Sequence, residues 1–450
     1  MQGTTSSTLT IEPDDSRAAE PESFALRWVF PQPPLAPTWL VDSVTTFGRD
    51  STRTVHLDSR YVSREHAAIK RSGPIFILAD IGSKNGVAVN GRTVSEAALS
   101  AGDVVRLGDF VAVCVSAPIG ADLSSGSLGP GIYGGFHLRQ AVERLRELAP
   151  TDLPVVLEGQ TGTGKETFAR ALHEASRRHG PFFAVNCAVY SKDMAAAELF
   201  GYRKGAFTGA ASPNLGHVRA AQGGTLLLDE LTELSGDVQA MLLRVLENRE
   251  VLPLGDSTPT PIDVRFVAAT QIPLAAAVGA GRMRADLQAR LEGAVIPLPT
   301  LAVSREVLLE TFLMMFERHA GVRPALRAAF AEQISLCSFP LNLRELDTLA
   351  RRMAASYRTD SVLDGKDLIR AMGSSRPDSR SPGESAIGPA AGNGAIYHPE
   401  EVAALRAALE QARGNLTKAA AALGVSRSKA YRMLRPRSRR RSGGSGIDFR

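Results

Sequence analysis

Residues 154–165 read PVVLEGQTGTGK, and this stretch decides the fold of the largest part of the chain. A short apolar run, residues 154–158, leads directly into a loop with three glycines and a final lysine, Lys165. A helical pattern follows, with Phe168, Leu172 and Ala175 on one face. A strand, a glycine-rich loop and a helix in this order point backbone N–H groups and a helix N-terminus at phosphate. The sequence therefore predicts a P-loop within a parallel α/β sheet.

Two further features concern the nucleotide that this loop would bind. The expected ATP-binding residues of the loop are Gly159, Gln160, Thr161, Gly162, Thr163, Gly164, Lys165 and Glu166. Glu166 stands where the pattern usually has Ser or Thr, which on its own weakens the prediction. However, a second buried strand, residues 225–228, ends in Asp229 and Glu230, which supply a magnesium-site carboxylate and a base that polarises water. Because a chance match to the loop would lack this acidic pair, ATP and magnesium are the predicted cofactors.

The composition of the whole chain limits the possible classes of protein. It has 450 residues, 44% hydrophobic and 22% charged, so we expect a soluble protein of about three domains. No run reaches the roughly 18 apolar residues of a membrane helix and no signal-peptide pattern is visible, which predicts a cytoplasmic location. Cys114, Cys187 and Cys337 lie far apart without metal-ligand spacing. They are expected to be buried thiols, and a structural zinc is not expected.

Charge and low-complexity segments divide the chain. Residues 1–23 are acidic and are expected to be a disordered tail, whereas residues 427–441 are strongly basic. The basic end favours a polyanionic partner, with a solvated tail that binds nothing as the alternative. Residues 118–131 and 373–396 are rich in small and polar residues, as linkers are. The predicted domains are residues 24–117, 132–372 and 397–436, followed by a basic tail at 437–450.

The first domain shows short alternating strands between turn residues, which favours a β-sandwich. Its loops contain Gly48-Arg49, SREH at 63–66, DIGSKNG at 80–86 and VNG at 89–91. In this order they resemble the forkhead-associated (FHA) domain, whose members bind phosphothreonine peptides. The resemblance implies that Arg49, Ser63 and Arg64 hold the phosphate and that Asn85 bonds the peptide backbone, while His66 braces the loops.

Physical chemistry supports this implied phosphate site. A phosphate has nearly two negative charges and three acceptor oxygens, which a guanidinium and a hydroxyl from different loops can satisfy. The alternative is a sandwich whose turns simply need Gly and Asn, but turn formation does not require the Arg and the Ser. Val87 stands where the family usually has Thr, and we expect it to affect loop packing.

Residues 205–210 read GAFTGA and point to what ATP would be used for. Two glycines and two alanines around Phe207 and Thr208 suit a flexible loop that presents one aromatic ring and one hydroxyl. With this loop, residues 132–372 resemble the AAA+ domain of the NtrC-like activators of sigma-54 RNA polymerase, in which Glu after the P-loop lysine is normal. Residues 184–188, 198–201, 223–225 and 242–246 also match that family. The resemblance implies that sigma-54 contacts Gly205, Ala206, Phe207, Thr208, Gly209 and Ala210.

The same resemblance implies catalytic roles and a division into an α/β domain, residues 132–300, and a helical lid, residues 301–372. Asn186 would hold Glu230 away from water until the nucleotide state changes. Arg284 and Arg290 would be arginine fingers that reach a neighbour's ATP, which implies a homo-oligomeric ring, expected to be a hexamer. Arg344 in the lid would sense the γ-phosphate, and Gln271 occupies the sensor position in the α/β domain.

Several positions depart from the family pattern. Gln271 replaces Asn at the sensor position, and residues 302–304, Ala-Val-Ser, replace Arg-Glu-Arg. Arg219 stands where Glu is usual, and Leu341 where Gly is usual. These changes predict slow or conditional ATP hydrolysis, while the retained Lys165, Asp229 and Glu230 argue against its loss.

The last domain has an expected helix at 401–411 and a second one at 416–423, followed by a glycine turn and a basic helix that begins near Ser426. It resembles the Fis-type helix-turn-helix that closes this family. The second helix of such a motif enters the major groove of DNA. The implied DNA-contacting residues are Thr417, Lys418, Ser426, Arg427, Ser428, Lys429 and Arg432. A helical oligomerisation hairpin is the alternative.

Together these domains predict a sigma-54-dependent transcriptional activator. Phosphothreonine made in a Ser/Thr kinase pathway would be bound by the FHA domain, and the C-terminal domain would hold upstream DNA. ATP turnover would then move the GAFTGA loops against sigma-54. The alternative, favoured by Gln271 and residues 302–304, is a DNA-bound FHA phosphopeptide adaptor with a weak or inactive ATPase ring. An AAA+ unfoldase or helicase loader has no need of GAFTGA.

Overall fold

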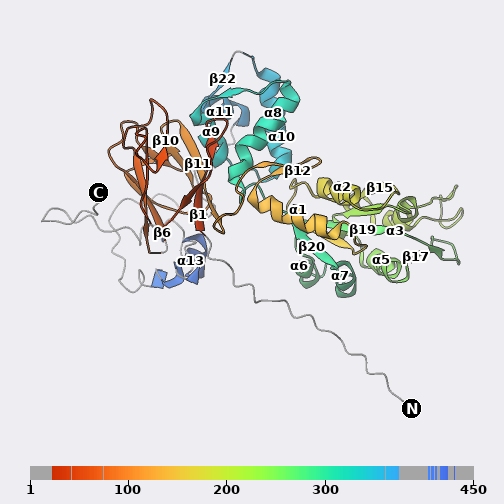
Figure 1. Cartoon of the computed structure of the whole chain (residues 1–450). Coiled ribbons are helices and arrows are strands. Elements are labelled where there is room, and N and C mark those ends of the chain that lie inside the picture. Colours follow the sequence, from red (N-terminus) through yellow and green to blue (C-terminus); the bar gives the residue numbers. More distant parts are fainter. Residues whose placement is uncertain are drawn as a thin grey trace, which may run out of the picture.

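The computed structural model describes residues 23–41, 43–73, 75–359 and 361–373, and near the C-terminal end residues 404–405, 407–409, 411–412, 416–423 and 430. A β-sandwich, a bundle of helices and a parallel α/β sheet follow one another across the molecule, with the helices between the other two (Figure 1). The predicted β-sandwich, α/β domain and helical lid are confirmed. Among the described residues, no helix is long and apolar enough to cross a membrane.

The sandwich consists of two sheets with strand orders β2-β1-β11-β10-β7-β8 and β4-β3-β5-β6-β9. Its strands are β1 (Ser23–Phe30), β2 (Thr38–Leu40), β3 (Thr45–Gly48), β4 (Val55–His56), β5 (Ala67–Ser72), β6 (Ile75–Asp80), β7 (Val87–Val89), β8 (Arg92–Val94), β9 (Glu96–Leu99), β10 (Val104–Leu107) and β11 (Phe110–Ala117). Trp28 fills the space between the sheets and meets Phe47 and Phe110 edge-on, at ring-centroid distances of 6.2 and 6.0 Å. Such edge-to-face contacts suit the quadrupoles of aromatic rings.

The α/β domain has a parallel sheet in the order β15-β16-β19-β14-β20. These strands are β14 (Val155–Glu158), β15 (Phe182–Asn186), β16 (Thr225–Asp229), β19 (Arg265–Thr270) and β20 (Ala294–Pro297). The helices of this domain are α1 (Phe136–Leu148), α2 (Lys165–Ala175), η1 (Cys187–Val189), α3 (Lys192–Phe200), α4 (His217–Ala220), η2 (Leu231–Glu233), α5 (Gly236–Asn248), α6 (Leu274–Gly279) and α7 (Ala285–Leu291). A small ribbon, β17 (Glu250–Val251) and β18 (Thr260–Pro261), extends from it.

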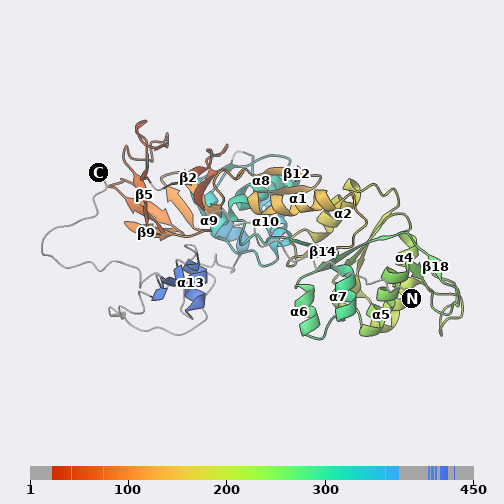
Figure 2. The ribbon, with the colours of Figure 1, turned by 60° about the horizontal axis from the view of Figure 1, so that its bottom comes forward.

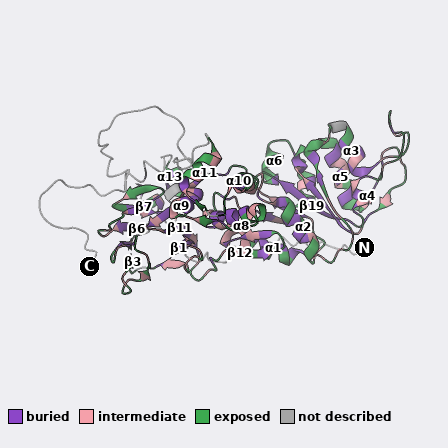
Figure 3. Ribbon diagram, turned by 90° about the horizontal axis from the view of Figure 1, so that it is seen from above, coloured by how far each residue is buried: buried purple, intermediate pink, exposed green. Residues whose placement is uncertain are grey.

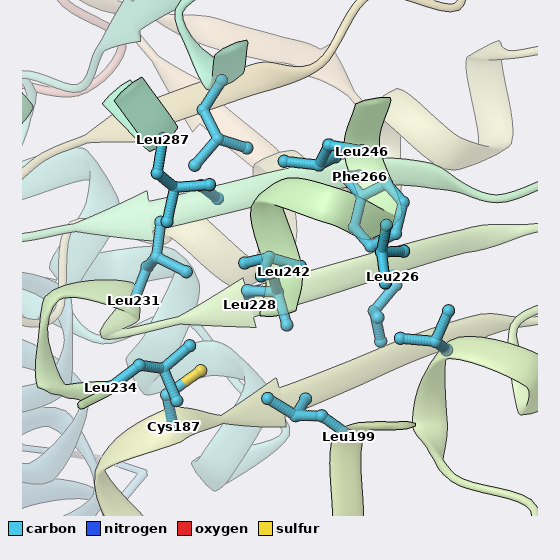
Figure 4. Close-up of a cluster of buried hydrophobic side chains, with 14 of the residues drawn as sticks. Cys187, Leu199, Leu226, Leu228, Leu231, Leu234, Leu242, Leu246, Phe266 and Leu287 are labelled. Atoms are coloured by element: carbon cyan, nitrogen blue, oxygen red, sulfur yellow. The ribbon is translucent and has the colours of Figure 1, made fainter. Parts of the chain in front are cut away.

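Helices cover both faces of this sheet because its strands are apolar on both sides. Leu227 of β16 packs with α1 and α2, while its neighbours Leu226 and Leu228 pack with α3, α5, α6 and α7. Figure 4 shows the second cluster, in which Leu242 lies beside Leu228 and Phe266 lies beside Leu226 and Leu246. The helices accordingly lie above and below the sheet in Figure 2, and the buried residues follow the sheet in Figure 3. The sheet is thereby a rigid platform for the residues at its strand ends.

The lid packs directly against the sandwich. Its elements are η3 (Arg305–Val307), α8 (Leu308–Ala320), β21 (Ala325–Leu326), α9 (Ala328–Leu336), α10 (Asn342–Ser356), β22 (Val362–Leu363) and α11 (Gly365–Met372). One hydrophobic cluster joins Val104, Val111 and Val113 of the sandwich to lid residues that include Phe312 and Phe330. At its edge, Arg106 of β10 forms a 3.0 Å ion pair with Glu332 of α9, whose side chain is 9% exposed. The shared core makes the sandwich and the lid one packed unit.

Residues 118–131, whose composition indicates a linker, are ordered in the structure. Strand β12 (Gly126–Gly129) pairs with β13 (Ile132–Gly134), and Leu123 and Leu128 are buried. Leu128 packs with α1, and Leu123 packs with Ala25 and Val115 of the sandwich. The segment therefore fixes the sandwich to the α/β domain in addition to connecting them.

Near the C-terminal end, helix α13 (Leu416–Ala422) agrees with the expected first helix of the helix-turn-helix. Leu405, Leu409, Ala419, Ala420 and Ala430 are buried together. The expected basic helix, apart from Ala430, lies outside the described residues, as do the tail at 437–450 and the linker at 374–396.

Candidate functional site

The P-loop runs from the end of β14 to the start of α2, as predicted. Gly162 and Gly164 have positive φ values of 78° and 95°, which glycine adopts without a steric penalty. Gly164 caps α2, so the free N–H groups of this helix end face the loop. The Lys165 Nζ donates to the carbonyls of Gly159 and Gln160 at 2.7 and 3.3 Å. Burial lowers the pKa of Lys165, and the charges of Asp229 and Glu230 oppose this shift.

The lid closes over this loop through residues at the start of α10. Asn342 is buried with φ of 48°, donates from Nδ2 to the Thr161 carbonyl at 3.0 Å and accepts from the Leu301 N–H at 2.9 Å. Leu343 N–H donates to the Gly162 carbonyl at 3.0 Å. A Cβ atom on Gly162 would lie 2.0 Å from the Leu341 carbonyl oxygen and 3.4 Å from the Cβ of Arg344. Arg344 thus lies beside the loop, and Asn342 is a residue that the motifs did not identify.

The acidic pair lies at the carboxyl end of the sheet, next to the P-loop. Asn186, Asp229 and Ala269 are in register across β15, β16 and β19, so their strands end at the same edge. Burial raises the pKa of Asp229, and the charge of Lys165 opposes this shift. Glu230 has a φ of 54°, a left-handed conformation that is strained for a residue with a side chain. This residue links the end of β16 to η2.

Two amide side chains lie at this edge and make different contacts. Gln271 Nε2 donates to Glu230 Oε1 at 2.6 Å. Asn186 Oδ1 instead accepts from the Ala188 N–H at 2.9 Å and caps η1. The structure therefore brings Gln271 to Glu230, whereas the Asn186 side chain bonds to the turn that follows its own strand.

The two predicted arginine fingers lie on the surface around α7. Arg284 pairs with Asp286 through two hydrogen bonds of 3.0 and 2.6 Å, and its side chain is 45% exposed. Arg290 is exposed and donates to the Leu246 carbonyl at 3.5 Å. Both guanidinium groups bond to nearby groups of their own subunit.

The GAFTGA stretch forms a tight loop between α3 and α4. Gly205 N–H donates to the Ala210 carbonyl at 2.9 Å, and Gly205 and Gly209 both have positive φ values. Phe207 is 45% exposed and its ring meets that of Tyr202 at a centroid distance of 4.9 Å. Thr208 is exposed beside it. The loop therefore presents one aromatic ring and one hydroxyl at the surface, as its sequence predicts.

A second loop supports the base of GAFTGA. Arg203 forms a 2.5 Å ion pair with Asp256, and Arg203 N–H donates to the Leu254 carbonyl. A Cβ atom on Gly255 would lie 2.8 Å from the Cβ of Ala206, so the two loops are in close contact. The sequence motifs did not identify Asp256 as a support, because its contact with Arg203 joins segments far apart in the chain. Tyr202 and Arg203 lie just before the GAFTGA stretch and were not part of the motif.

The four predicted phosphothreonine residues lie on loops at one end of the sandwich. Arg49 follows β3, Ser63 and Arg64 precede β5, and Asn85 precedes β7. Backbone bonds join the first two loops, from Arg49 N–H to the Ser63 carbonyl at 2.9 Å and from Asp50 N–H to the Arg64 carbonyl at 3.3 Å. The guanidinium-bearing residues Arg49 and Arg64 are exposed. A cationic surface next to a hydroxyl suits a phosphate.

Hydrogen bonds fix the third loop against the second. Lys84 N–H donates to Ser63 Oγ at 2.9 Å, and Asn85 Nδ2 donates to the Tyr61 carbonyl at 2.7 Å. Behind them His66 is fully buried, and its Nδ1 accepts from the Ser63 N–H at 3.1 Å. Burial lowers the pKa of His66, which keeps this ring nitrogen available as an acceptor. The close contact of Gly48 with the Arg64 carbonyl, 2.0 Å from an added Cβ, explains the glycine before Arg49.

The predicted DNA-contacting residues are only partly described. Lys418 is exposed on α13, and the backbone of Thr417 belongs to the same helix. Ser426, Arg427, Ser428, Lys429 and Arg432 lie outside the described residues.

Comparisons with known proteins agree with the three domains. Residues 134–297 match the family model of the sigma-54 interaction domain, residues 45–108 that of the FHA domain and residues 400–434 that of bacterial regulatory proteins of the Fis family. The Nif-specific regulatory protein of Rhizobium leguminosarum bv. trifolii is 41% identical over 232 residues, which cover 50% of this chain and 65% of that protein. The DNA-binding transcriptional regulator NtrC of Bradyrhizobium sp. is 37% identical over 318 residues, or 65% of this chain and 66% of that protein.

A solved structure extends the similarity to the fold. NtrX from Brucella abortus in complex with ATP is 26% identical, with a TM-score of 0.50 over 66% of this chain and 67% of that chain. The P-loop, the acidic strand end and the helical lid define the class of AAA+ nucleotide-binding proteins. Within that class, the chain is similar to NtrC-like sigma-54-dependent transcriptional activators, and it contains a sigma-54 interaction domain, an FHA domain and a Fis-family segment. It spans less than two thirds of the length of these curated relatives.

Proposed function

We propose that this protein hydrolyses ATP in a homo-oligomeric ring and uses the hydrolysis to drive open-complex formation by sigma-54 RNA polymerase. The proposal rests above all on one arrangement within the α/β domain. Lys165, Asp229 and Glu230 meet at the sheet edge, and the same domain presents Phe207 and Thr208 at the surface. A nucleotide site and an exposed contact loop within one domain are what a motor of this family needs.

The nucleotide would be bound with magnesium. Mg²⁺ is usually held by one or two carboxylates together with phosphate oxygens and water. Asp229 fits this role, because it is a half-buried carboxylate whose charge Lys165 stabilises. Among the described residues there is no group of three or more acidic, His or Cys side chains that could hold a metal ion alone. The phosphates of ATP would therefore complete the site, with Glu230 as the base for the attacking water.

Ring formation would complete the catalytic site in trans. Arg284 is exposed at the start of α7 and bonds to Asp286, so its guanidinium is free of the core and available to a neighbouring subunit. An arginine supplied by a neighbour stabilises the charge that develops during phosphoryl transfer. Arg290 lies on the same short helix and would act beside it. The hexamer expected for this family would place six such interfaces around the ring.

Phosphothreonine recognition by the FHA loops would regulate this ring through the lid. The sandwich shares a hydrophobic cluster with the lid, and the lid bonds directly to the P-loop through Asn342 and Leu343. A peptide bound to Arg49, Ser63, Arg64 and Asn85 would thus contact the sandwich, which is joined through the lid to the nucleotide site. The Fis-type segment would hold the complex on upstream DNA.

The test is an assay of ATP hydrolysis and of sigma-54-dependent transcription with the purified full chain. We expect both activities in the wild type, and an effect of a phosphothreonine peptide that Arg49→Ala abolishes. Glu230→Gln should bind ATP without hydrolysing it, and Thr208→Ala should hydrolyse ATP without supporting transcription. If the wild type hydrolyses ATP but never supports sigma-54 transcription, with or without the peptide, the proposed function is wrong.

A second candidate is a phosphopeptide adaptor whose ring binds ATP without turnover. The observation that favours it is the engagement of the base Glu230 by Gln271. The two candidates differ in one measurement. An adaptor would show the same ATPase rate in the wild type as in Glu230→Gln, whereas a motor would not.

A further inference from the structure

We infer that Gln239 is the positioning residue for the arginine finger Arg284 and that it joins this finger to the turn behind the base Glu230. The inference rests on the proposed ATPase function and adds to it a residue that the motifs do not contain. Gln239 lies on α5 and is only 2% exposed. Its side chain makes three hydrogen bonds, all to backbone groups outside its own helix. One buried amide thus fixes two separate segments of the chain.

The three bonds use both the nitrogen and the oxygen of the amide. Gln239 Nε2 donates to the Leu234 carbonyl at 2.8 Å and to the Arg282 carbonyl at 2.9 Å. Its Oε1 accepts from the Arg284 N–H at 2.9 Å. Because carbonyls only accept and a backbone N–H only donates, these partners determine the orientation of the amide. A hydrocarbon side chain of the same size would leave all three backbone groups without this partner.

On one side, Gln239 fixes the backbone that presents the finger. Arg284 is the N-cap residue of α7, and the N–H groups at this end of a helix have no partner within the helix. Its guanidinium is 45% exposed and pairs with Asp286 of the same turn. Since the side chain extends into solvent, its backbone sets the place from which it reaches a neighbour. That backbone is anchored by Gln239 and by Met283, which is buried in the core.

On the other side, Gln239 holds the turn that follows the base. The short helix η2 begins directly after Glu230 and ends at Leu234, whose carbonyl Gln239 binds. Leu231 of this turn and Leu287 of α7 belong to the same buried cluster (Figure 4). The base and the finger segment are therefore connected through one short turn and one side chain.

A second link joins the same two segments but is weaker. Arg282 Nη1 lies 3.7 Å from Glu233 Oε1, and their side chains are 47% and 49% exposed, so solvent screens the pair. A buried hydrogen bond is electrostatically stronger than one in water, which makes Gln239 the main connection. Coupling between two sites requires such a shared element. A nucleotide change that moves η2 therefore also moves Arg284, the finger that serves the neighbour's ATP.

The first experiment compares Gln239→Met with Gln222→Met in the full chain. Met has a similar volume but no amide. Gln222 is the matched control, because its Oε1 also accepts a backbone N–H, that of Asp263, but at the opposite edge of the sheet. We expect Gln239→Met to lower kcat about tenfold or more with KM for ATP changed less than about twofold, since a finger acts on the transition state. Gln222→Met should hydrolyse ATP as the wild type does.

Mixed rings distinguish a displaced finger from a damaged site. Glu230→Gln subunits cannot hydrolyse ATP but keep an intact finger. Adding them to Gln239→Met should raise the ATPase rate per Gln239→Met subunit about threefold or more, because a finger acts in trans. Arg284→Ala subunits lack the finger and should give no such rise. Sedimentation with a non-hydrolysable ATP analogue measures ring size in every sample.

A hydrogen-exchange arm needs neither hydrolysis nor a variant. In nucleotide-free wild type, the Arg284 amide should exchange at least about ten times more slowly than that of Ala285, the first residue of α7, after correction for intrinsic rates. If the wild type proves unable to hydrolyse ATP, the proposed function fails. The exchange rates would still decide whether Gln239 anchors the finger segment.

Four results would overturn the inference. One is an equal ATPase rate in Gln239→Met and Gln222→Met. Another is the absence of a gain from Glu230→Gln subunits, which would place the damage in the variant's own site. The third is loss of ring assembly in Gln239→Met but not in Arg284→Ala. The last is an Arg284 amide that exchanges as fast as that of Ala285.

Discussion

At the residue scale, the nucleotide site depends on close backbone contacts as much as on charged side chains. Gly162 is the clearest case, because an added Cβ would lie 2.0 Å from the Leu341 carbonyl and its φ is positive. The same residue accepts the Leu343 N–H bond that holds the lid. A position that needs glycine for both space and conformation tolerates no substitution without movement of the lid.

We therefore expect Gly162→Ala to weaken ATP binding at least tenfold and to destabilise the protein by about 1 to 3 kcal/mol. Gly279→Ala is the matched control, since an added Cβ there has no atom within 4 Å. That control should change stability by less than about 0.5 kcal/mol. Calorimetric titration with an ATP analogue and thermal unfolding measure both quantities. Equal behaviour of the two variants would contradict the assigned role of the P-loop and lid contact.

At the scale of elements, the short helix η3 and strand β1 meet around a buried carboxylate. Burial raises the pKa of Glu306 to about 7. The groups that line the same cavity include Arg27, Tyr133 and Glu310. Glu306 lies two residues after the segment 302–304, in which Ala-Val-Ser replaces the family's Arg-Glu-Arg, so this changed region lies where the sandwich meets the lid.

This carboxylate predicts a pH dependence of stability. The folded protein holds a proton on Glu306 up to about pH 7, whereas an unfolded Glu releases it near 4.5. The folded state therefore binds more protons between these values, and stability falls as the pH rises through this window. The loss amounts to at most roughly 3 kcal/mol. In Glu306→Gln the melting temperature should fall less between pH 5 and pH 8 than in the wild type, and an equal fall would disprove the prediction.

The ion pair between β10 and α9 gives a second prediction for the same junction. Burial raises the pKa of Glu332, and Arg106 opposes this shift. Arg106→Met leaves a nearly buried carboxylate without its partner, and we expect a loss of about 1 to 3 kcal/mol, moderated by the exposure of Arg106. Adding Glu332→Gln should recover part of this loss. A double-mutant cycle by thermal unfolding measures the coupling, and strictly additive effects would contradict it.

The sequence could predict sites whose residues are close together in the chain, but not contacts between segments that are far apart in it. The P-loop, GAFTGA and the FHA loops are continuous motifs, so the residues that act together are also neighbours in sequence. The bond between Gln271 and Glu230 joins two strand ends, and no local pattern shows that an amide one methylene longer reaches the base. The sequence indicated the contact between the sandwich and the lid only weakly. Strand β11 is buried along nearly its whole length, and such an unbroken apolar run indicates a strand covered on both faces.

At the scale of the whole molecule, the sandwich, the lid and the P-loop form one continuous series of contacts. Leu336 at the end of α9 lies at the edge of this series, where an added Cβ on Gly91 of the sandwich would be 3.3 Å from Leu336 Cδ1. A charge at this position would loosen the sandwich from the lid without touching the peptide loops or the nucleotide site. Coupling between two sites requires such a shared element.

We expect Leu336→Glu to bind a phosphothreonine peptide and ATP as the wild type does, while the peptide no longer changes the ATPase rate. Ile369→Glu is the matched control, because Ile369 is 45% exposed on α11 and lies outside the shared cluster. Peptide binding by fluorescence anisotropy and ATPase assays in parallel test this. A full peptide response in Leu336→Glu would mean that the signal takes another route.

The shared core of sandwich and lid also sets limits on engineering. Lid residues of the shared cluster, among them Phe330 of α9, would be left facing water if the motor were expressed without its sensor domain, and such apolar patches promote aggregation. Low solubility of a truncated protein would then report lost packing, and it should not be mistaken for lost regulation. Grafting a different sensor onto this motor would require redesign of the exposed face of α9 along with the graft.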